Sequence, residues 1–301
     1  MNYLELIKRA FQITFQHRLL WIFGLFVGMV GGNFYGGGLN FNNVQHLVRK
    51  KEIIGSFQNF QNFLTSNFFW IVLVSLILFL ALLVFIFLNT LSQSALISLV
   101  NKIEKKEKIK ISDGISIGLA RFWKILGINI LFSCFISLVL VILGTPIFLL
   151  FILEMPLRGL LLLFFAIIIF VPLACVFSFV LNYSYRYIVI QKKTIFNSIQ
   201  KSFQLLSENI IPTLIIFLIL IGINFAASLI FGIVLLCLVL FLGIPLFLLG
   251  LVLHTFLGII SSIILAIFGI LVLTAFSFLF SAILNTYNST LWTLVFRELT
   301  K

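Results

Sequence analysis

Acidic and histidine side chains are scarce in this chain of 301 residues, which has only eight Asp and Glu residues and three His. The acidic residues lie in predicted loops, interfacial segments and tails, and the histidines lie on separate segments without an HExxH spacing. An enzyme that works at a membrane needs a nucleophile, a metal site or an acid–base pair in a protected cavity. The sequence therefore predicts no catalytic residues, no metal site and no cofactor, and favours a non-enzymatic protein.

Cysteine is also rare, and all three residues lie inside apolar runs: Cys134, Cys175 and Cys237. We interpret them as small packing or lipid-facing residues rather than as a disulfide or metal set.

Charge of either sign is nearly absent from long stretches of the chain. Charged residues make up 9% and hydrophobic residues 62% of the sequence, whereas soluble domains are about a quarter charged. The charge-free runs are long enough for bilayer crossings of about 20 residues each. We expect six crossings in an all-α, polytopic membrane helix bundle, at about 19–34, 68–90, 124–152, 159–184, 210–240 and 258–287. The basic segment before the first crossing has no convincing cleavage site, so we expect it to be retained as a helix.

The basic residues predict an orientation. Sixteen of them, Arg186 included, fall on one predicted side of the membrane and four on the other: Arg49, Lys50, Lys51 and Arg158. Because cytoplasmic loops carry an excess of Lys and Arg, both termini are expected in the cytoplasm. The net charge of +12 then reflects this bias, with attraction to anionic lipids, and needs no nucleic acid.

The second half of the chain partly repeats itself. Residues 127–129 (GIN), 144–150 and 177–182 recur at 222–224, 243–249 and 280–285. We interpret the chain as one integral membrane domain of three hairpin units, at about 1–100, 101–193 and 194–301, with an outer loop at about 35–66. Each unit ends on a Leu-Asn pair at Asn89, Asn182 or Asn285. We interpret these asparagines as caps or interhelical hydrogen bonds at the membrane interface in preference to substrate contacts.

Each unit also begins with a segment that carries apolar residues at helical spacing, such as Leu4, Phe11 and Phe15 in the first. Such helices are expected to lie in the interface with basic residues among the headgroups. The candidate headgroup contacts are Lys105, Lys106, Lys108, Lys110, Arg121, Lys192, Lys193 and Lys201.

Three further features concern the interior of the membrane. The repeat-related Asn129 and Asn224 are the best intramembrane polar candidates, as a midplane site or, in the favoured interpretation, as interhelical hydrogen bonds. Gly24, Gly28 and Gly32 predict close helix approach. The break at residues 243–245 (GIP) is either an outer turn within 241–257, which its twin at 144–146 favours, or a kink inside a long helix.

Several stretches carry a family resemblance: residues 20–26 (LWIFGLF), 118–123 (GLARFW), 187–190 (YIVI), 198–203 (SIQKSF) and 290–299 (TLWTLVFREL). In these the chain resembles poorly characterised bacterial membrane proteins related to the membrane domain of some glycerophosphodiester phosphodiesterases. The resemblance implies a multi-pass architecture in the bacterial cytoplasmic (inner) membrane. In those enzymes a separate soluble barrel performs the hydrolysis, so no such activity is expected here.

Two functions remain open at this level. The favoured one is a non-enzymatic membrane protein that contacts lipids, anionic ones included, or serves as an assembly or scaffold partner of another membrane protein. The alternative is a transporter or channel for a small or lipidic solute, with Asn129 and Asn224 along the path.

Overall fold

The computed structural model describes residues 2–30, 67–153, 155–252 and 256–301. These residues form eight helices and contain no strand. The helices are α1 (Tyr3–Gln16), α2 (Leu19–Val30), α4 (Phe68–Glu104), α5 (Ile111–Ile152), α6 (Pro156–Ile190), α7 (Ile195–Glu208), α8 (Ile210–Val252) and α9 (Phe256–Leu299). The protein is thus an all-α, multi-pass membrane helix bundle, as predicted.

Five helices are long and apolar enough to cross a membrane: α4, α5, α6, α8 and α9. The remaining predicted crossing, the first along the chain at about 19–34, is only partly described. Its visible helix, α2, has 12 residues and rises about 18 Å, which is short of the roughly 30 Å hydrocarbon core. The predicted remainder to residue 34, with Gly32, lies outside the described residues, as does the predicted outer loop at 35–66.

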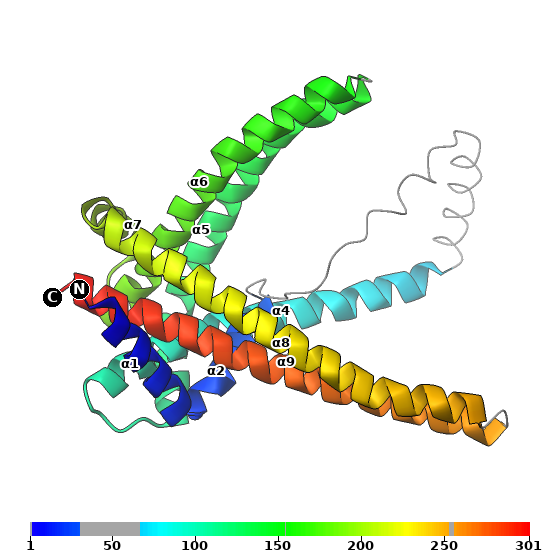
Figure 1. Cartoon of the computed structure of the whole chain (residues 1–301). Helices are drawn as coiled ribbons and strands as arrows, with labels where there is room; N and C mark the ends of the chain where they lie inside the picture. The colour runs from blue at the N-terminus through cyan, green and yellow to red at the C-terminus, as the bar shows by residue number, and fades with distance from the viewer. Residues whose placement is uncertain (1, 31–66, 154, 253–255) are drawn as a thin grey trace.

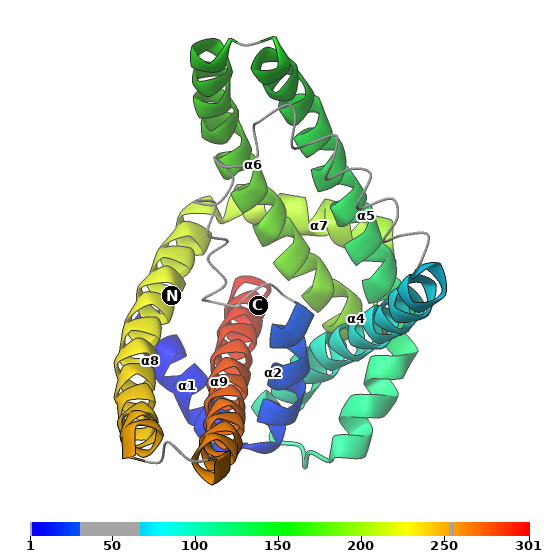
Figure 2. The same ribbon diagram turned by 90° about the vertical axis from the view of Figure 1, so that its right-hand side faces the viewer.

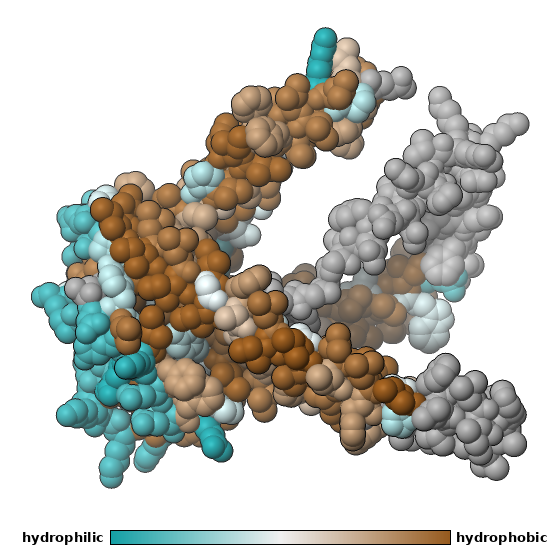
Figure 3. Space-filling model, in the orientation of Figure 1, coloured by the Kyte–Doolittle hydropathy of each residue, from teal (hydrophilic) through white to brown (hydrophobic). Residues whose placement is uncertain are grey.

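The helices meet at one end of the molecule and diverge from it (Figure 1). Both chain termini and the short helices α1 and α7 lie at this end, and α4, the α5–α6 pair and the α8–α9 pair extend away from it (Figures 1 and 2). We call the shared end the base and the diverging parts the arms. The hydrophilic surface gathers on the base, and the arms are hydrophobic (Figure 3).

Each long helix is divided into an arm part and a base part. The arm parts comprise residues 68–89, 133–152, 157–178, 221–241 and 266–281, in which Gly159 and Gly269 are the only buried residues among those described. About 20 residues of helix span about 30 Å, the thickness of a hydrocarbon core. The helices exceed one crossing because they continue into the base, where all of residues 90–100 of α4 except Gln93 and most of 179–189 of α6 are buried.

Aromatic contacts between α6 and α9 fill the core of the base. Tyr183 meets Trp292 edge to face at 5.7 Å between ring centroids, and Tyr187 meets Phe296 at 4.8 Å. Such pairs each contribute about 0.5–1.5 kcal/mol beyond the burial of apolar area. The Tyr183 hydroxyl also shares a 2.8 Å hydrogen bond with Thr213 of α8, so this core joins three of the crossing helices.

The three predicted interfacial segments bury small residues, and the first two expose most of their apolar stripes, whereas the stripe of the third is largely buried or half-buried. Ala10 and Thr14, Gly114 and Gly118, and Ser198 and Ser202 are all buried, each pair one helical turn apart. In contrast, Phe11 and Phe15 are 56% and 43% exposed. The second segment is not a separate helix as predicted, but the first three turns of α5. It lies against α4, where a side chain at Gly118 would come within 3.0 Å of Leu91.

Of the two alternatives for residues 241–257, the outer turn at 243–245 is wrong, and residues 253–255 lie outside the described residues. Helix α8 continues through Pro245 to Val252, and α5 likewise continues through Pro146. A proline removes one backbone hydrogen bond and crowds the preceding turn, but the neighbouring turns can keep the helix intact. The alternative of a kink inside a long helix is confirmed to the extent that residues 243–245 lie inside a long helix.

Candidate functional site: a polar cavity between base and arms

Arg186 is the only charged side chain that is buried among the described residues, with 2% of its surface exposed. It lies on α6, and its guanidinium donates hydrogen bonds to the carbonyl of Asn182 one turn earlier and, at 3.1 Å, to the carbonyl of Ser289 on α9. Its Nε–H has no hydrogen-bond partner. Within the part of the chain that the structure describes, no carboxylate forms an ion pair with it.

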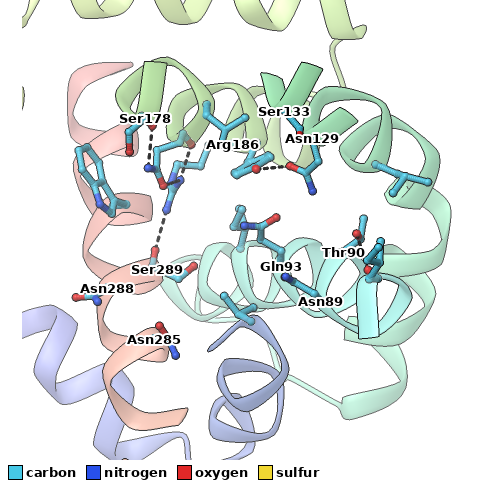
Figure 4. Close-up of a pocket in the computed structure, with 18 of the residues that line it drawn as sticks. Asn89, Thr90, Gln93, Asn129, Ser133, Ser178, Arg186, Asn285, Asn288 and Ser289 are labelled. Atoms are coloured by element: carbon cyan, nitrogen blue, oxygen red, sulfur yellow. Dashed lines mark hydrogen bonds between the residues drawn. The ribbon is translucent and has the colours of Figure 1, made fainter. Parts of the chain in front are cut away.

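Arg186 lines a cavity of about 720 Å³ whose walls come from α2, α4, α5, α6 and α9 (Figure 4). The wall contains amides and hydroxyls among aliphatic side chains, and none of its residues is acidic. Besides Arg186, its polar members are Asn89, Thr90, Gln93, Asn129, Ser133, Ser178, Asn182, Tyr185, Asn285, Asn288 and Ser289. The cavity lies where the arms enter the base, because Asn89, Asn182 and Asn285 each follow the exposed part of their helix.

The three Leu-Asn asparagines do not cap helices. Asn89, Asn182 and Asn285 lie inside α4, α6 and α9, and all three line the cavity. Asn182 and Asn285 donate to the carbonyls of Ser178 and Ser281 on their own helices, at 2.9 and 2.7 Å. The prediction of caps is wrong because each helix continues for at least eight residues beyond its asparagine.

The two predicted intramembrane asparagines lie in adjoining cavities. Asn129 lines the first and accepts a hydrogen bond from the Tyr185 hydroxyl (Figure 4). Asn224 lines a second cavity of about 580 Å³ and accepts from the Asn288 amide at 3.1 Å. The cavities share four lining residues: Ser178, Asn182, Asn288 and Trp292. Both asparagines therefore form interhelical hydrogen bonds and also line a cavity.

The predicted headgroup contacts lie apart from the cavity, on the base. Lys105, Lys106, Lys108 and Lys110 are exposed in the connection between α4 and α5, and Arg121 of α5 is half-buried. Lys192 and Lys201 are exposed and Lys193 is half-buried around the start of α7. The hydrogen-bonding and repulsive interaction with Lys201 lowers the pKa of Lys193. Two cations this close disfavour each other's charged form.

Sequence reasoning missed Arg186, which it counted among the basic residues of the cytoplasmic surface. In the structure, Arg186 is instead buried in the base, beside the aromatic core between α6 and α9. A signal was present in the sequence: the fourth residue after each Leu-Asn asparagine is polar, giving Gln93, Arg186 and Ser289, and all three line the cavity. One helical turn separates positions four apart, so each asparagine and its partner share a helix face.

The residues of the site can be described by the groups that they offer to a ligand. Among the described residues, no three His, Cys, Asp or Glu side chains come together as a metal site would require. The cavity instead provides one cation, several amide donors and apolar walls, which together suit an anionic group attached to an apolar body. The expectation that the protein is not an enzyme stays a prediction.

Comparison with known proteins gives one match. Residues 9–298 match a family of unknown function (DUF7544). No curated protein and no solved structure matches the chain, so the resemblance to the membrane domain of glycerophosphodiester phosphodiesterases stays a prediction. Because the match covers nearly the whole sequence, the chain belongs to this family of unknown function, DUF7544.

Proposed function

We propose that the protein is a non-enzymatic, lipid-interacting protein of the bacterial inner membrane, with its base and both termini on the cytoplasmic side. The single observation that carries the proposal is the unpaired positive charge of the exposed lysines on the base. The hydrophilic surface gathers on the same part of the molecule, beside the start of the apolar arms (Figure 3). Among the described lysines only Lys102 and Lys301 form ion pairs. The exposed lysines of the base would then lie at headgroup level, where anionic lipids supply the missing partners.

The backbone supports this role for two of the lysines. Lys106 and Lys192 have φ of 60° and 59°, a left-handed conformation at the ends of α4 and α6 that usually selects glycine. A lysine there costs about 1 kcal/mol relative to glycine. Strain that persists at an exposed position is a reason to suspect a function for the side chain.

Lipid retention tests the proposal. The purified protein would be reconstituted into vesicles of phosphatidylglycerol and phosphatidylcholine in equal amounts, re-extracted with mild detergent, and analysed for co-purifying lipid. Wild type is expected to retain phosphatidylglycerol in excess, and replacement of Lys105, Lys106, Lys108 and Lys110 by Gln should move the retained ratio towards that of the vesicle.

A matched comparison separates the base from the arms. Lys108→Gln removes one charge from the base, whereas Arg158→Gln removes one at the tip of the α5–α6 arm, where that side chain is exposed. Only the first should reduce the retained phosphatidylglycerol. Equal lipid ratios in wild type and the four-lysine variant would exclude the lipid role and leave a scaffold role for a membrane protein partner.

A second candidate function is transport of a small or lipidic solute. The observation in its favour is the pair of adjoining cavities, which contain the repeat-related Asn129 and Asn224. Transporters often bind substrate near the membrane interior at positions that internal repeats contribute.

A further inference from the structure

We infer that the cavity around Arg186 is a binding site for an anionic phosphate or carboxylate group. The inference concerns a site separate from the exposed lysines, so it can hold whether or not those lysines bind lipid. Its basis is a buried guanidinium that has acceptors for some, but not all, of its donors.

Because Arg186 is buried, its charge needs hydrogen-bond acceptors or a counter-ion in place of water. A guanidinium always carries its charge in a protein, and its donors lie in a planar fork that matches carboxylate and phosphate oxygens. Here two backbone carbonyls, of Asn182 and Ser289, accept from the two terminal nitrogens. The Nε–H remains without an acceptor although the side chain is 98% buried, since its exposed fraction is 2%. An anion at the cavity face of this fork would satisfy the orphaned donor and compensate the charge.

The cavity wall also contains two side-chain amide oxygens that lack a hydrogen-bond donor. Gln93 of α4 faces the same cavity from below Arg186 (Figure 4), and its Oε1 is buried without a partner. Asn288 of α9 also has a buried, unpartnered Oδ1. These two oxygens are acceptors and need a donor such as a hydroxyl of the ligand, whereas the Arg186 Nε–H needs an anionic oxygen. Hydrogen phosphate and the glycerol headgroup of phosphatidylglycerol carry both kinds of group.

The remainder of the wall indicates what carries the anionic group. Aliphatic side chains of Val27, Ile86 and Leu126 line the same cavity. A volume of about 720 Å³ is far larger than a bare phosphate needs and falls in the range of small-molecule sites, about 300–1,000 Å³. Two sources share this chemistry: the headgroup of an anionic lipid that enters between the arms, and a free anion from the cytoplasm.

Ligand-induced thermal stabilisation of the full chain tests the site. Inorganic phosphate would be titrated into the protein in neutral detergent, and phosphatidylglycerol or phosphatidylcholine would be titrated as mixed micelles in the same detergent. A ligand that binds the folded state raises the melting temperature in a saturable way. Saturation with phosphate would identify a free anion as the source, and saturation with phosphatidylglycerol alone would identify a lipid headgroup.

Substitutions then assign the binding to the cavity. Arg186→Gln should abolish the saturable shift, and Arg186→Lys, which keeps the charge but loses the fork, should weaken apparent affinity about tenfold. Gln93→Leu leaves Arg186 in place and should weaken the apparent affinity roughly three- to tenfold. Arg158→Gln at the arm tip and the four-lysine variant of the base should bind as wild type does.

Three results would overturn the inference: no saturable shift with either probe, wild-type affinity in both Arg186→Lys and Gln93→Leu, or an equal loss in Arg158→Gln. Should Arg186→Gln fail to fold, the lysine and leucine variants decide the matter. A four-lysine variant that loses lipid enrichment but keeps this binding separates the two sites. If wild type itself shows no lipid enrichment while this binding persists, only the proposed function fails.

Discussion

Arg186 and the lysines of the base are all basic residues, but they occupy opposite environments. The lysines are exposed beyond the ends of helices, where water and headgroups solvate their charge. Arg186 is buried one helical turn after Asn182, with carbonyl acceptors and no acidic partner among the described residues. A buried ion without a partner costs roughly several kcal/mol. Arg186 therefore lowers the free energy of unfolding through its buried charge, whereas Lys106 and Lys192 lower it through their left-handed backbone conformation.

At Lys106 we predict that glycine stabilises the protein. Its φ of 60° suits glycine, and its N–H and that of Glu107 close the end of α4 by bonds to Ile103 and Lys102 carbonyls. Lys106→Gly should raise the free energy of unfolding by about 0.5–1 kcal/mol, measured by thermal or denaturant unfolding in detergent. Lys108→Gly, at a position without positive φ, is the control and should be neutral or destabilising. Equal effects of both substitutions would refute the strain argument.

At the scale of helices, glycines in similar sequence contexts have different neighbours. A side chain at Gly24 of α2 would collide with Thr286 and the Ala282 carbonyl of α9, and one at Gly28 would collide with Asn285. Gly144, Gly222 and Gly243, which belong to the internal repeat, have nothing within 4 Å of such a side chain. Close helix approach is thus confirmed for Gly24 and Gly28.

This contrast predicts opposite effects of one substitution. Gly24→Ala should force α2 away from α9 and lower the free energy of unfolding by about 1–3 kcal/mol. Gly222→Ala meets open space on α8 and should raise it by up to about 1 kcal/mol through helix propensity. Unfolding curves of the two variants in the same detergent provide the measurement. A Gly24→Ala protein as stable as wild type would mean that α2 and α9 are not in close contact.

At the scale of the whole molecule, the two cavities lie where separate arms converge on one base. The first cavity takes walls from five helices, and the second joins α6, α8 and α9. Lipid tails provide no hydrophobic force that would press apolar arms together. The buried aromatic and small residues of the base provide the contacts instead, so the arms can diverge while the base holds the cavities together.

If the protein transports a lipidic solute, cavity substitutions should slow that transport. We predict that Asn129→Leu and Asn224→Leu each reduce the translocation of fluorescent phosphatidylglycerol about tenfold, because each removes a polar group from the path. Dithionite quenching of reconstituted vesicles measures the rate. Asn197→Leu, on an exposed position of α7 outside both cavities, should leave it unchanged. Wild-type rates no faster than those of protein-free vesicles would exclude this function for that solute.

Predictions from sequence succeeded where the cause is local. Apolar runs predicted the crossings from α4 onward, and the i, i+4 glycines predicted a close helix approach, which α2 makes with α9. The outer-turn alternative failed at Pro245, where the surrounding turns maintain the helix. The cap interpretation failed at the three asparagines, whose helices continue into the base. Of the cavity, Asn129 was predicted as an intramembrane polar group, whereas Arg186 was assigned to the surface.

The sequence by itself determined an all-α, multi-pass membrane protein with its positive charge concentrated at one end, because hydropathy and charge act along short stretches of chain. Only the tertiary structure decided which polar residues meet. The sequence of an apolar helix is similar whether lipid or protein surrounds the helix. An arginine near a helix end is predicted to be exposed, because the sequence does not show that a second helix covers it. Asn89, Gln93, Asn129, Arg186 and Ser289 share one cavity because four helices, α4, α5, α6 and α9, pack there.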